Sequence, residues 1–251
     1  MTRIINSEIV EYLSIEKRNY MDHSIPTVSK CLLNGIRKLY ESDRYTDVTI
    51  YVENQPLSCH KVILSAVSGY FDAMFSSGMR EATSEKIALQ NISLKTFKDI
   101  LSFVYSGKDI INHETAEELL VASSMLQMDC LQVKCEKFMV HNIDNNNCLN
   151  MWKLGKTLNC GMIVKVSKPF VLDHFQEIAE SEDFLRLEKD DVLSFVHDEN
   201  LNVAREEFVC DVIFKWIKKD EEKRKTCVTG TIYEFKVFVN DFRLHFRCGR
   251  L

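Results

Sequence analysis

The spacing of hydrophobic residues changes along the chain, and this change limits the folds open to it more than any other feature. Hydrophobic and polar residues alternate over 47–53, which is typical of a half-buried β-strand. The turn-forming residues at 53–56 are followed by Leu57-Ser-Cys-His, so the pattern predicts a β-hairpin. Residues 86–90 offer one more short strand. The N-terminal half therefore predicts one small sheet.

Helical spacing surrounds these strands. It extends over 28–40 and over 60–74, where the hydrophobic residues from Val62 to Met74 are expected to face one way. A third helix is expected after Ser93, which can cap its first turn, and before Gly107, which can adopt the left-handed conformation past its end. A fourth runs from about His113 to Leu126. We therefore predict an α+β domain, a small sheet flanked by helices.

The second half of the chain shows helical spacing alone until its last residues. An all-helical second domain is therefore expected. Its helices are expected at 131–142, 147–158, 161–180, 189–197 and 204–218. Alternation returns at 235–239 and 242–246 and predicts a lone hairpin. Such a hairpin is marginal in water, so this tail either docks on the helices or lacks that structure.

The composition narrows the classes of function. A chain of 251 residues with 45% hydrophobic and 27% charged residues is typical of a globular protein of two domains. No apolar run reaches the roughly 18 residues that span a membrane, so no membrane association is expected. The 32 basic and 37 acidic residues leave a net charge of −5, which argues against nucleic acid as a partner.

The cysteines and histidines do not form a reactive or metal-binding pattern. The nine cysteines are scattered, which fits a reducing cytoplasm or nucleus. Cys59 and His60 are neighbours in an extended segment and point to opposite faces, so we expect a core thiol and a structural histidine. Cys130, Cys135 and His141 have spacings that place them on different helix faces. We predict no enzyme, no metal site and no cofactor.

Long ordered motifs resemble a BTB domain followed by a BACK domain, as in the kelch-like family of cullin-3 ubiquitin ligase adaptors. The resemblance covers roughly residues 23–224 and implies a BTB/POZ fold followed by an all-α BACK domain. Its motifs are His23, Leu32-Leu-Asn-Gly-Ile-Arg-Lys-Leu-Tyr, Asp47-Val-Thr-Ile, Cys59 through Phe75, Met79-Arg-Glu, Phe97 through Gly107, Cys135-Glu-Lys-Phe-Met, Asn147 through Trp152, Phe175-Gln-Glu-Ile, Phe184-Leu-Arg-Leu, Asp198 through Val203 and Glu207 through Ile217.

The resemblance also implies a division of the chain. We expect an N-terminal extension at 1–22, the BTB/POZ domain at 23–130, the helical 3-box and BACK region at 131–224, and an atypical tail at 225–251. The BACK region is expected to be incomplete, because the helices that normally continue past Trp216 have no counterpart after residue 224. No kelch repeat follows, which is consistent with a short form, an isoform or an incomplete gene model.

A BTB homodimer is implied by the resemblance, and the apolar stripe of 28–40 agrees with it, because a monomer would leave part of that stripe exposed. The expected interface residues are Leu32, Leu33, Ile36, Leu39 and Asp47. Asp47 is predicted to be a buried structural carboxylate beside the interface. Ordinary intradomain packing is the alternative for Leu32 and Ile36.

Cullin-3 is the partner implied by the resemblance. From spacing alone, Met79 followed by Glu81 fits an anchor with an orienting charge for a partner's helix, or equally a solvated loop with a half-buried methionine. The resemblance matches Met79 and Glu81 to the hydrophobic-x-acid motif that such domains present to the cullin. It also places Phe75, Tyr105 and Leu126 in segments that line the same face.

The predicted function is a non-enzymatic adaptor in the cytoplasm or nucleus, which forms a homodimer or a heterodimer with other BTB proteins. A chain of this kind without a substrate-recognition module is expected to act as an inhibitor in mixed dimers. The alternative is a BTB scaffold, a transcriptional or cytoskeletal regulator that joins partners by dimerisation without a ligase.

Overall fold

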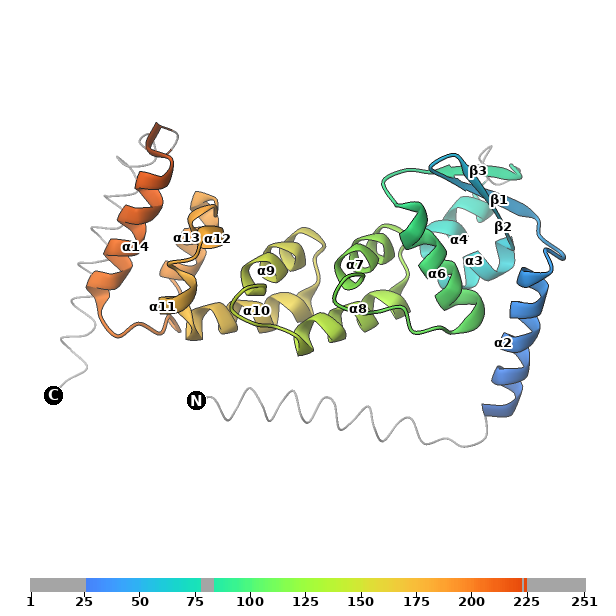
Figure 1. Ribbon diagram of the computed structural model, residues 1–251, viewed down its shortest axis with the longest axis horizontal. Coiled ribbons are helices and arrows are strands. Elements are labelled where there is room, and N and C mark those ends of the chain that lie inside the picture. Colours follow the sequence, from blue (N-terminus) through green and yellow to red (C-terminus); the bar gives the residue numbers. More distant parts are fainter. Residues whose placement is uncertain (1–25, 78–83, 223, 225–251) are drawn as a thin grey trace. The chain divides into compact units, whose positions relative to one another are not determined.

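The computed structural model describes residues 26–77, 84–222 and 224, and the chain separates into two units, residues 1–131 and 132–251 (Figure 1). The first unit mixes helices and strands, whereas every regular element described in the second unit is a helix. The predicted order, an α+β domain and then a helical domain, is confirmed. Helix α8 (Asp129–His141) begins in the first unit and continues into the second.

The sheet of the first unit has three strands in the order β2-β1-β3. Strand β1 (Val48–Val52) pairs antiparallel with β2 (Gln55–Cys59) and parallel with β3 (Lys86–Leu89). The two-residue turn between β1 and β2 has positive φ angles of 49° and 63° at Glu53 and Asn54, as a type I′ turn requires. The predicted hairpin is confirmed, and its second strand begins two residues earlier than expected.

The helical segment after His60 is broken, contrary to the single helix predicted there. Helix α3 (Lys61–Val67) ends at Ser68, which is extended, and α4 (Gly69–Ser76) begins directly after it. The Ser68 hydroxyl accepts a hydrogen bond from the Phe71 N–H and donates one to the Leu126 carbonyl at 2.5 Å. These bonds make Ser68 the N-cap of α4, so the segment forms two helices in place of one.

Helix α6 (Leu94–Ser106) begins and ends as expected. Its N-cap Ser93 accepts a hydrogen bond from the Thr96 N–H, and Gly107 is left-handed with φ 65°. Helix α7 (Ala116–Met125) starts later than predicted. A turn precedes it in which the Asn112 side chain accepts hydrogen bonds from the N–H groups of Glu114 and Thr115.

The core of the first unit lies between the sheet and its helices. Helix α2 (Pro26–Glu41) packs beside α6, α3 beside α4, and α6 beside α7. Alternate residues of β1 are buried, as its sequence predicts. The largest fully buried side chains of this unit are Phe71, Phe97, Ile50, Ile100, Leu101, Tyr105, Leu119, Leu120 and Leu126.

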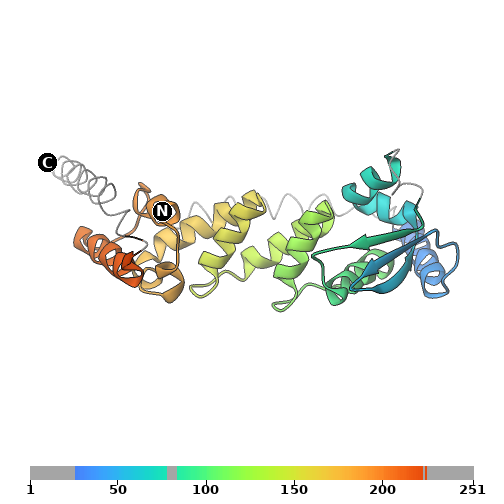
Figure 2. The same ribbon diagram turned by 90° about the horizontal axis from the view of Figure 1, so that it is seen from above.

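The second unit is a series of helices of which α9 (Cys148–Thr157) and α10 (Gly161–Asp173) form a neighbouring pair (Figure 2). The remaining helices are α11 (Phe175–Ile178), α12 (Glu182–Leu185), α13 (Lys189–Val196) and α14 (Glu206–Lys219). They share one core around Trp152, Phe175, Phe184, Phe195 and Trp216.

Two details of this unit differ from the sequence prediction. The helix expected over 161–180 is interrupted at His174. The backbone N–H of Asn202 donates a hydrogen bond to the Leu172 carbonyl, and its side-chain amide donates one to the Asp173 carbonyl. These two carbonyls therefore accept from Asn202 and not from the helix. Helix α12 was not expected, since a single turn leaves too short a pattern to detect.

The tail hairpin and the extension at 1–22 lie outside the described residues. Among the helices that the structure describes, none is long and apolar enough to cross a membrane.

Candidate interaction surfaces

Helix α2 has two apolar flanks with different surroundings. On one flank, Leu33 reaches the end of α6, where its Cδ2 lies 3.2 Å from the point at which a side chain on Gly107 would begin. On the same flank, Tyr40 stacks on Tyr105 of α6, with 4.0 Å between the ring centroids. On the other flank, Val28 and Leu32 are 74% and 63% exposed. Residues four apart lie above one another on a helix, so these two form one exposed stripe.

The predicted interface residues divide between these flanks. Leu32 is exposed and lies on the open stripe, whereas Leu33 is half-buried and turned toward α6. Ile36 and Leu39 are half-buried. Their role in a dimer stays a prediction.

A hydrogen-bond network joins the segment after α2 to the end of β2 and to α6. The Tyr105 hydroxyl accepts a hydrogen bond from the His60 N–H at 3.0 Å and lies 3.0 Å from His60 Nδ1. His60 Nε2 lies 2.8 Å from the Arg44 carbonyl oxygen, which can only accept, so Nε2 carries the proton and Nδ1 accepts from Tyr105. The pKa of Tyr105 is raised, chiefly by burial and further by Cys59. The phenol therefore stays a donor.

The pair Cys59-His60 is built into this network and is unsuited to nucleophilic chemistry. Burial raises the pKa of the Cys59 thiol to about 12, and the charges of Asp43 and Asp47 act in the same direction. A nucleophilic cysteine needs a lowered pKa, because the thiolate is the reactive form. The thiol is a core group, as the sequence predicts.

Asp47 differs from its prediction, since it is exposed in the single chain and not buried. Its Oδ1 accepts a hydrogen bond from the Lys61 N–H, the first residue of α3, at 2.7 Å. The carboxylate therefore supplies one of the N-terminal hydrogen bonds of α3 that the helix cannot make itself. Its structural role is helix capping from a distant segment.

The five predicted cullin-binding residues differ in whether the structure describes them and in how exposed they are. Met79 and Glu81 lie outside the described residues. Phe75 is half-buried at the end of α4, where Lys61 Nζ lies 5.3 Å from its ring centroid. Tyr105 and Leu126 are 1% and 2% exposed, so their placement on a binding face is corrected: both are core side chains. The resemblance indicates segments of the chain, and it does not show which way a helix turns its residues.

Sequence reasoning predicts the wrong orientation for an apolar side chain of α3. Val62 is 71% exposed on α3, although the helical spacing placed it inward. The face turned inward contains Leu64, Ser68 and Phe71, which are all buried. The signal that could have shown this exposure is Ser68, a strong N-cap residue in the middle of the single helix that the spacing predicts.

The cysteines and histidine considered for zinc do not converge. Cys130 and His141 are exposed, whereas Cys135 is buried and its pKa is raised to about 12 by burial and by Glu136. Within the described ranges, no three histidine, cysteine or acidic side chains are grouped so that they could hold a metal ion.

Two family models match the chain in sequence. The BTB/POZ domain model matches residues 36–143, and the model described as BTB And C-terminal Kelch, or BACK, matches residues 148–234. The chain is a BTB–BACK protein. The three-stranded sheet and its helices are the BTB domain, and the helices that follow are the BACK region.

Related proteins match the same BTB–BACK region. Kelch-like protein 25 of Xenopus laevis is 35% identical over 199 residues, which are 78% of this chain and 34% of that protein. Human Kelch repeat and BTB domain-containing protein 12 is 28% identical over 210 residues, 84% of this chain and 33% of that protein. Among solved structures, the BTB domain of zebrafish PATZ1 matches 48% of this chain and 98% of that chain, with 26% identity and a TM-score of 0.43. The chain spans about a third of the length of the curated relatives it matches.

Proposed function

We propose that this BTB–BACK protein is a non-enzymatic adaptor that dimerises through its BTB domain and binds cullin-3 in a ubiquitin ligase complex. The exposed stripe of Val28 and Leu32 on α2 is the observation that carries the proposal. Contiguous exposed apolar residues on a helix mark a surface that a protein partner covers. The partner is a second copy of this chain or another BTB protein.

The rigid support of α2 adds to this proposal. The flank of α2 that faces its own domain is held by the stack of Tyr40 on Tyr105, so the exposed stripe is presented in one orientation. Preorganised surfaces lose less conformational entropy on binding. The described cysteines are all free, which favours a reducing compartment, and we place the adaptor in the cytoplasm or nucleus.

Replacing Leu32 and Ile36 together by aspartate should convert the dimer to a monomer in sedimentation velocity of the full chain. Two buried anchors that become charged weaken a dimer by about a hundredfold or more. Leu32 is exposed and Ile36 half-buried in the single chain, so circular dichroism should remain unchanged. Val133→Asp, which also replaces an apolar residue by aspartate at an exposed position, on α8, is the control and should remain dimeric. A wild-type chain that sediments as a monomer at about 10 µM contradicts the dimer proposal.

Replacing Met79 and Glu81 together by alanine should weaken binding to purified cullin-3 by about thirtyfold or more in calorimetric titration, because an interface anchor typically contributes about 2 kcal/mol or more. Met125→Ala, which truncates an exposed methionine of α7, is the control and should bind as the wild type does. Unchanged affinity of the double variant removes this site from the proposal.

A BTB scaffold without a ligase is the second candidate function. It is favoured by the burial of Tyr105 and Leu126, which removes two of the five predicted cullin contacts. A wild-type dimer that does not bind cullin-3 in the same titration supports the scaffold and contradicts the ligase adaptor.

A further inference from the structure

The loop between α2 and β1 holds an exposed aromatic side chain on a strained backbone. Tyr45 is 73% exposed and has a φ of 61°, in the left-handed region, and Asp43 of the same loop has a φ of 53°. A bulky residue rarely takes this conformation, which glycine takes at lower cost. Strained residues of this kind are common at functional sites. The Tyr45 ring is therefore a candidate contact for a partner.

Hydrogen bonds fix the backbone of this loop. The Arg44 carbonyl accepts from His60 Nε2 at 2.8 Å, and the Arg44 N–H donates to the Leu39 carbonyl at 2.9 Å. The Arg44 guanidinium lies 5.2 Å from the centroid of the Tyr45 ring and donates to its phenol oxygen at 3.3 Å. The loop therefore presents an arginine–tyrosine pair to solvent on a fixed backbone, and such preorganisation lowers the entropy lost on binding.

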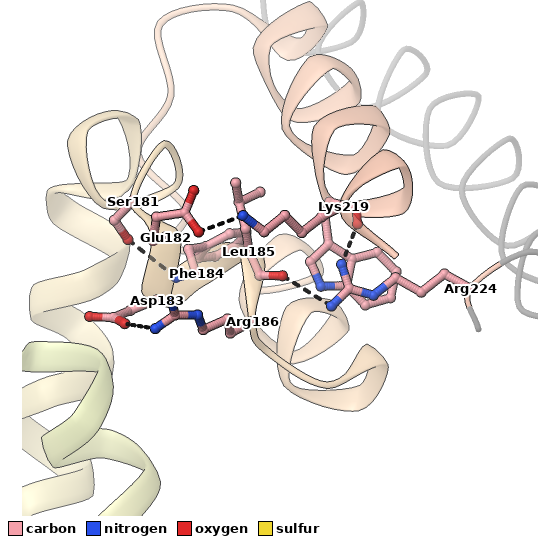
Figure 3. Close-up of polar contacts among 9 residues, drawn as sticks. Ser181, Glu182, Asp183, Phe184, Leu185, Arg186, Lys219 and Arg224 are labelled. Atoms are coloured by element: carbon pink, nitrogen blue, oxygen red, sulfur yellow. Dashed lines mark hydrogen bonds and ion pairs between the residues drawn. The ribbon is translucent and has the colours of Figure 1, made fainter. Parts of the chain in front are cut away.

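A second arginine–aromatic pair, in the BACK region, has different surroundings (Figure 3). The Arg224 guanidinium lies 4.0 Å from the Trp216 ring centroid and donates hydrogen bonds to the carbonyls of Leu185, at 3.0 Å, and Trp216. Trp216 is buried, so this pair is a contact of the BACK core. Arg44 and Tyr45 are both exposed, and tyrosine and arginine are enriched among the residues that contribute most to binding.

The start of α3 adds a second exposed apolar residue next to this loop. The Lys61 N–H donates a hydrogen bond to the Asp47 carboxylate at 2.7 Å, so the first turn of α3 lies beside the segment that follows the loop. Val62 comes directly after Lys61 and is 71% exposed. Tyr45 and Val62 therefore lie on neighbouring segments of the BTB domain.

The dimer proposed above needs more surface than the stripe on α2 offers. A stable interface covers about 800 Å² and about 20 residues on each partner. Val28 and Leu32 are only two side chains of one helix. Helix α2 ends at Glu41, and the loop that carries Tyr45 continues directly from it. The loop and the start of α3 therefore supply exposed apolar area that a second copy of the chain would cover.

We propose that Tyr45, supported by Arg44, is an anchor of the BTB dimer and packs together with Val62 against a second copy of the chain, which rests on the dimerisation proposed above. The strain at Tyr45 is then the cost of directing an aromatic ring toward the partner. Glycine at this position relieves the strain and removes the ring, so substitution separates the needs of the fold from those of the dimer.

Sedimentation equilibrium of the full chain compares Tyr45→Gly with Asp43→Gly as the matched control. Both substitutions relieve a left-handed residue of the same loop, and only the first removes an aromatic ring. The dimer dissociation constant should rise about thirtyfold or more in Tyr45→Gly, because an interface anchor is lost, and by less than about twofold in Asp43→Gly. Tyr45→Phe keeps the ring and should dimerise as the wild type does. Equal dissociation constants in Tyr45→Gly and the wild type overturn the proposal.

Photo-crosslinking tests the contact directly and does not depend on a loss of binding. p-Benzoylphenylalanine replaces Tyr45 in a mixture of ordinary and isotope-labelled full-length chains that have exchanged subunits. We expect crosslinks that join labelled to unlabelled chains, whereas the same residue at position 133, exposed on α8, should give none. A sample that sediments as a dimer but gives no crosslink between chains from position 45 overturns the anchor and leaves the dimer standing. A wild-type chain that sediments as a monomer contradicts the dimerisation and the anchor together.

Discussion

Trp216→Ala should lower the free energy of unfolding of the BACK region by about 4 kcal/mol, as large-to-small changes of buried aromatic residues do. Trp216 is 3% exposed, and its indole N–H donates to the Leu187 carbonyl at 2.8 Å. Alanine leaves a cavity in the core, an unpaired buried carbonyl, and Arg224 without the ring that it covers. This one substitution therefore removes core packing, a buried hydrogen bond and the contact of Arg224 with the ring.

The fluorescence of Trp152, the second tryptophan of the chain, reports this change in urea titration, because Trp152 lies in the same core. Trp216→Phe is the matched comparison. It keeps an aromatic ring and removes the N–H donor, so it should cost about 2 kcal/mol. A loss below about 1 kcal/mol for Trp216→Ala shows that α14 does not depend on this anchor.

Tyr105→Phe should destabilise the BTB domain by about 2 kcal/mol although only one oxygen atom is removed. The change leaves the His60 N–H without its acceptor and His60 Nδ1 without its donor, both in a buried site. Leaving a buried polar group unpaired costs about 1–3 kcal/mol. The aromatic stack with Tyr40 is retained, so the loss measures the hydrogen bonds alone.

Hydrogen exchange read by mass spectrometry on peptides of β1 and α6 measures this loss without interference from the BACK region. Tyr51→Phe removes a hydroxyl from a half-buried tyrosine of β1 and should change stability by less than about 0.5 kcal/mol. Equal exchange in Tyr105→Phe and the wild type contradicts the assignment of Tyr105 as a structural donor.

These predictions separate the interior of the BTB domain from its surface. The hydrogen bonds of Tyr105, His60 and the Arg44 carbonyl join the segment after α2 to α6, and the side chains of Tyr105 and His60 are buried. Changes there are expected to act on stability, and on dimerisation only through it. Changes at Leu32 are expected to act on dimerisation with the fold retained.

Local sequence was sufficient to predict the elements whose causes are local. The alternation of β1 predicts its buried face, and the turn-forming residues at 53–56 predict the hairpin. Ser93 and Gly107 predict both ends of α6. In each case residues within a few positions supply the hydrogen bonds or the backbone conformation, so the pattern survives without knowledge of the rest of the fold.

Contacts between distant segments decided what the sequence could not. Ser68 breaks a helix with a bond to Leu126, 58 residues away, and Asn202 interrupts α10 from 29 residues further along the chain. Asp47 caps α3 across the sheet and is exposed, and Tyr105 and Leu126 turn inward. The helical period shows that such residues share a face, but which face meets the core is set by packing against elements far away in sequence. The sequence by itself therefore determined the fold class and the order of its elements, and only the tertiary structure decided which of the candidate residues a partner can reach.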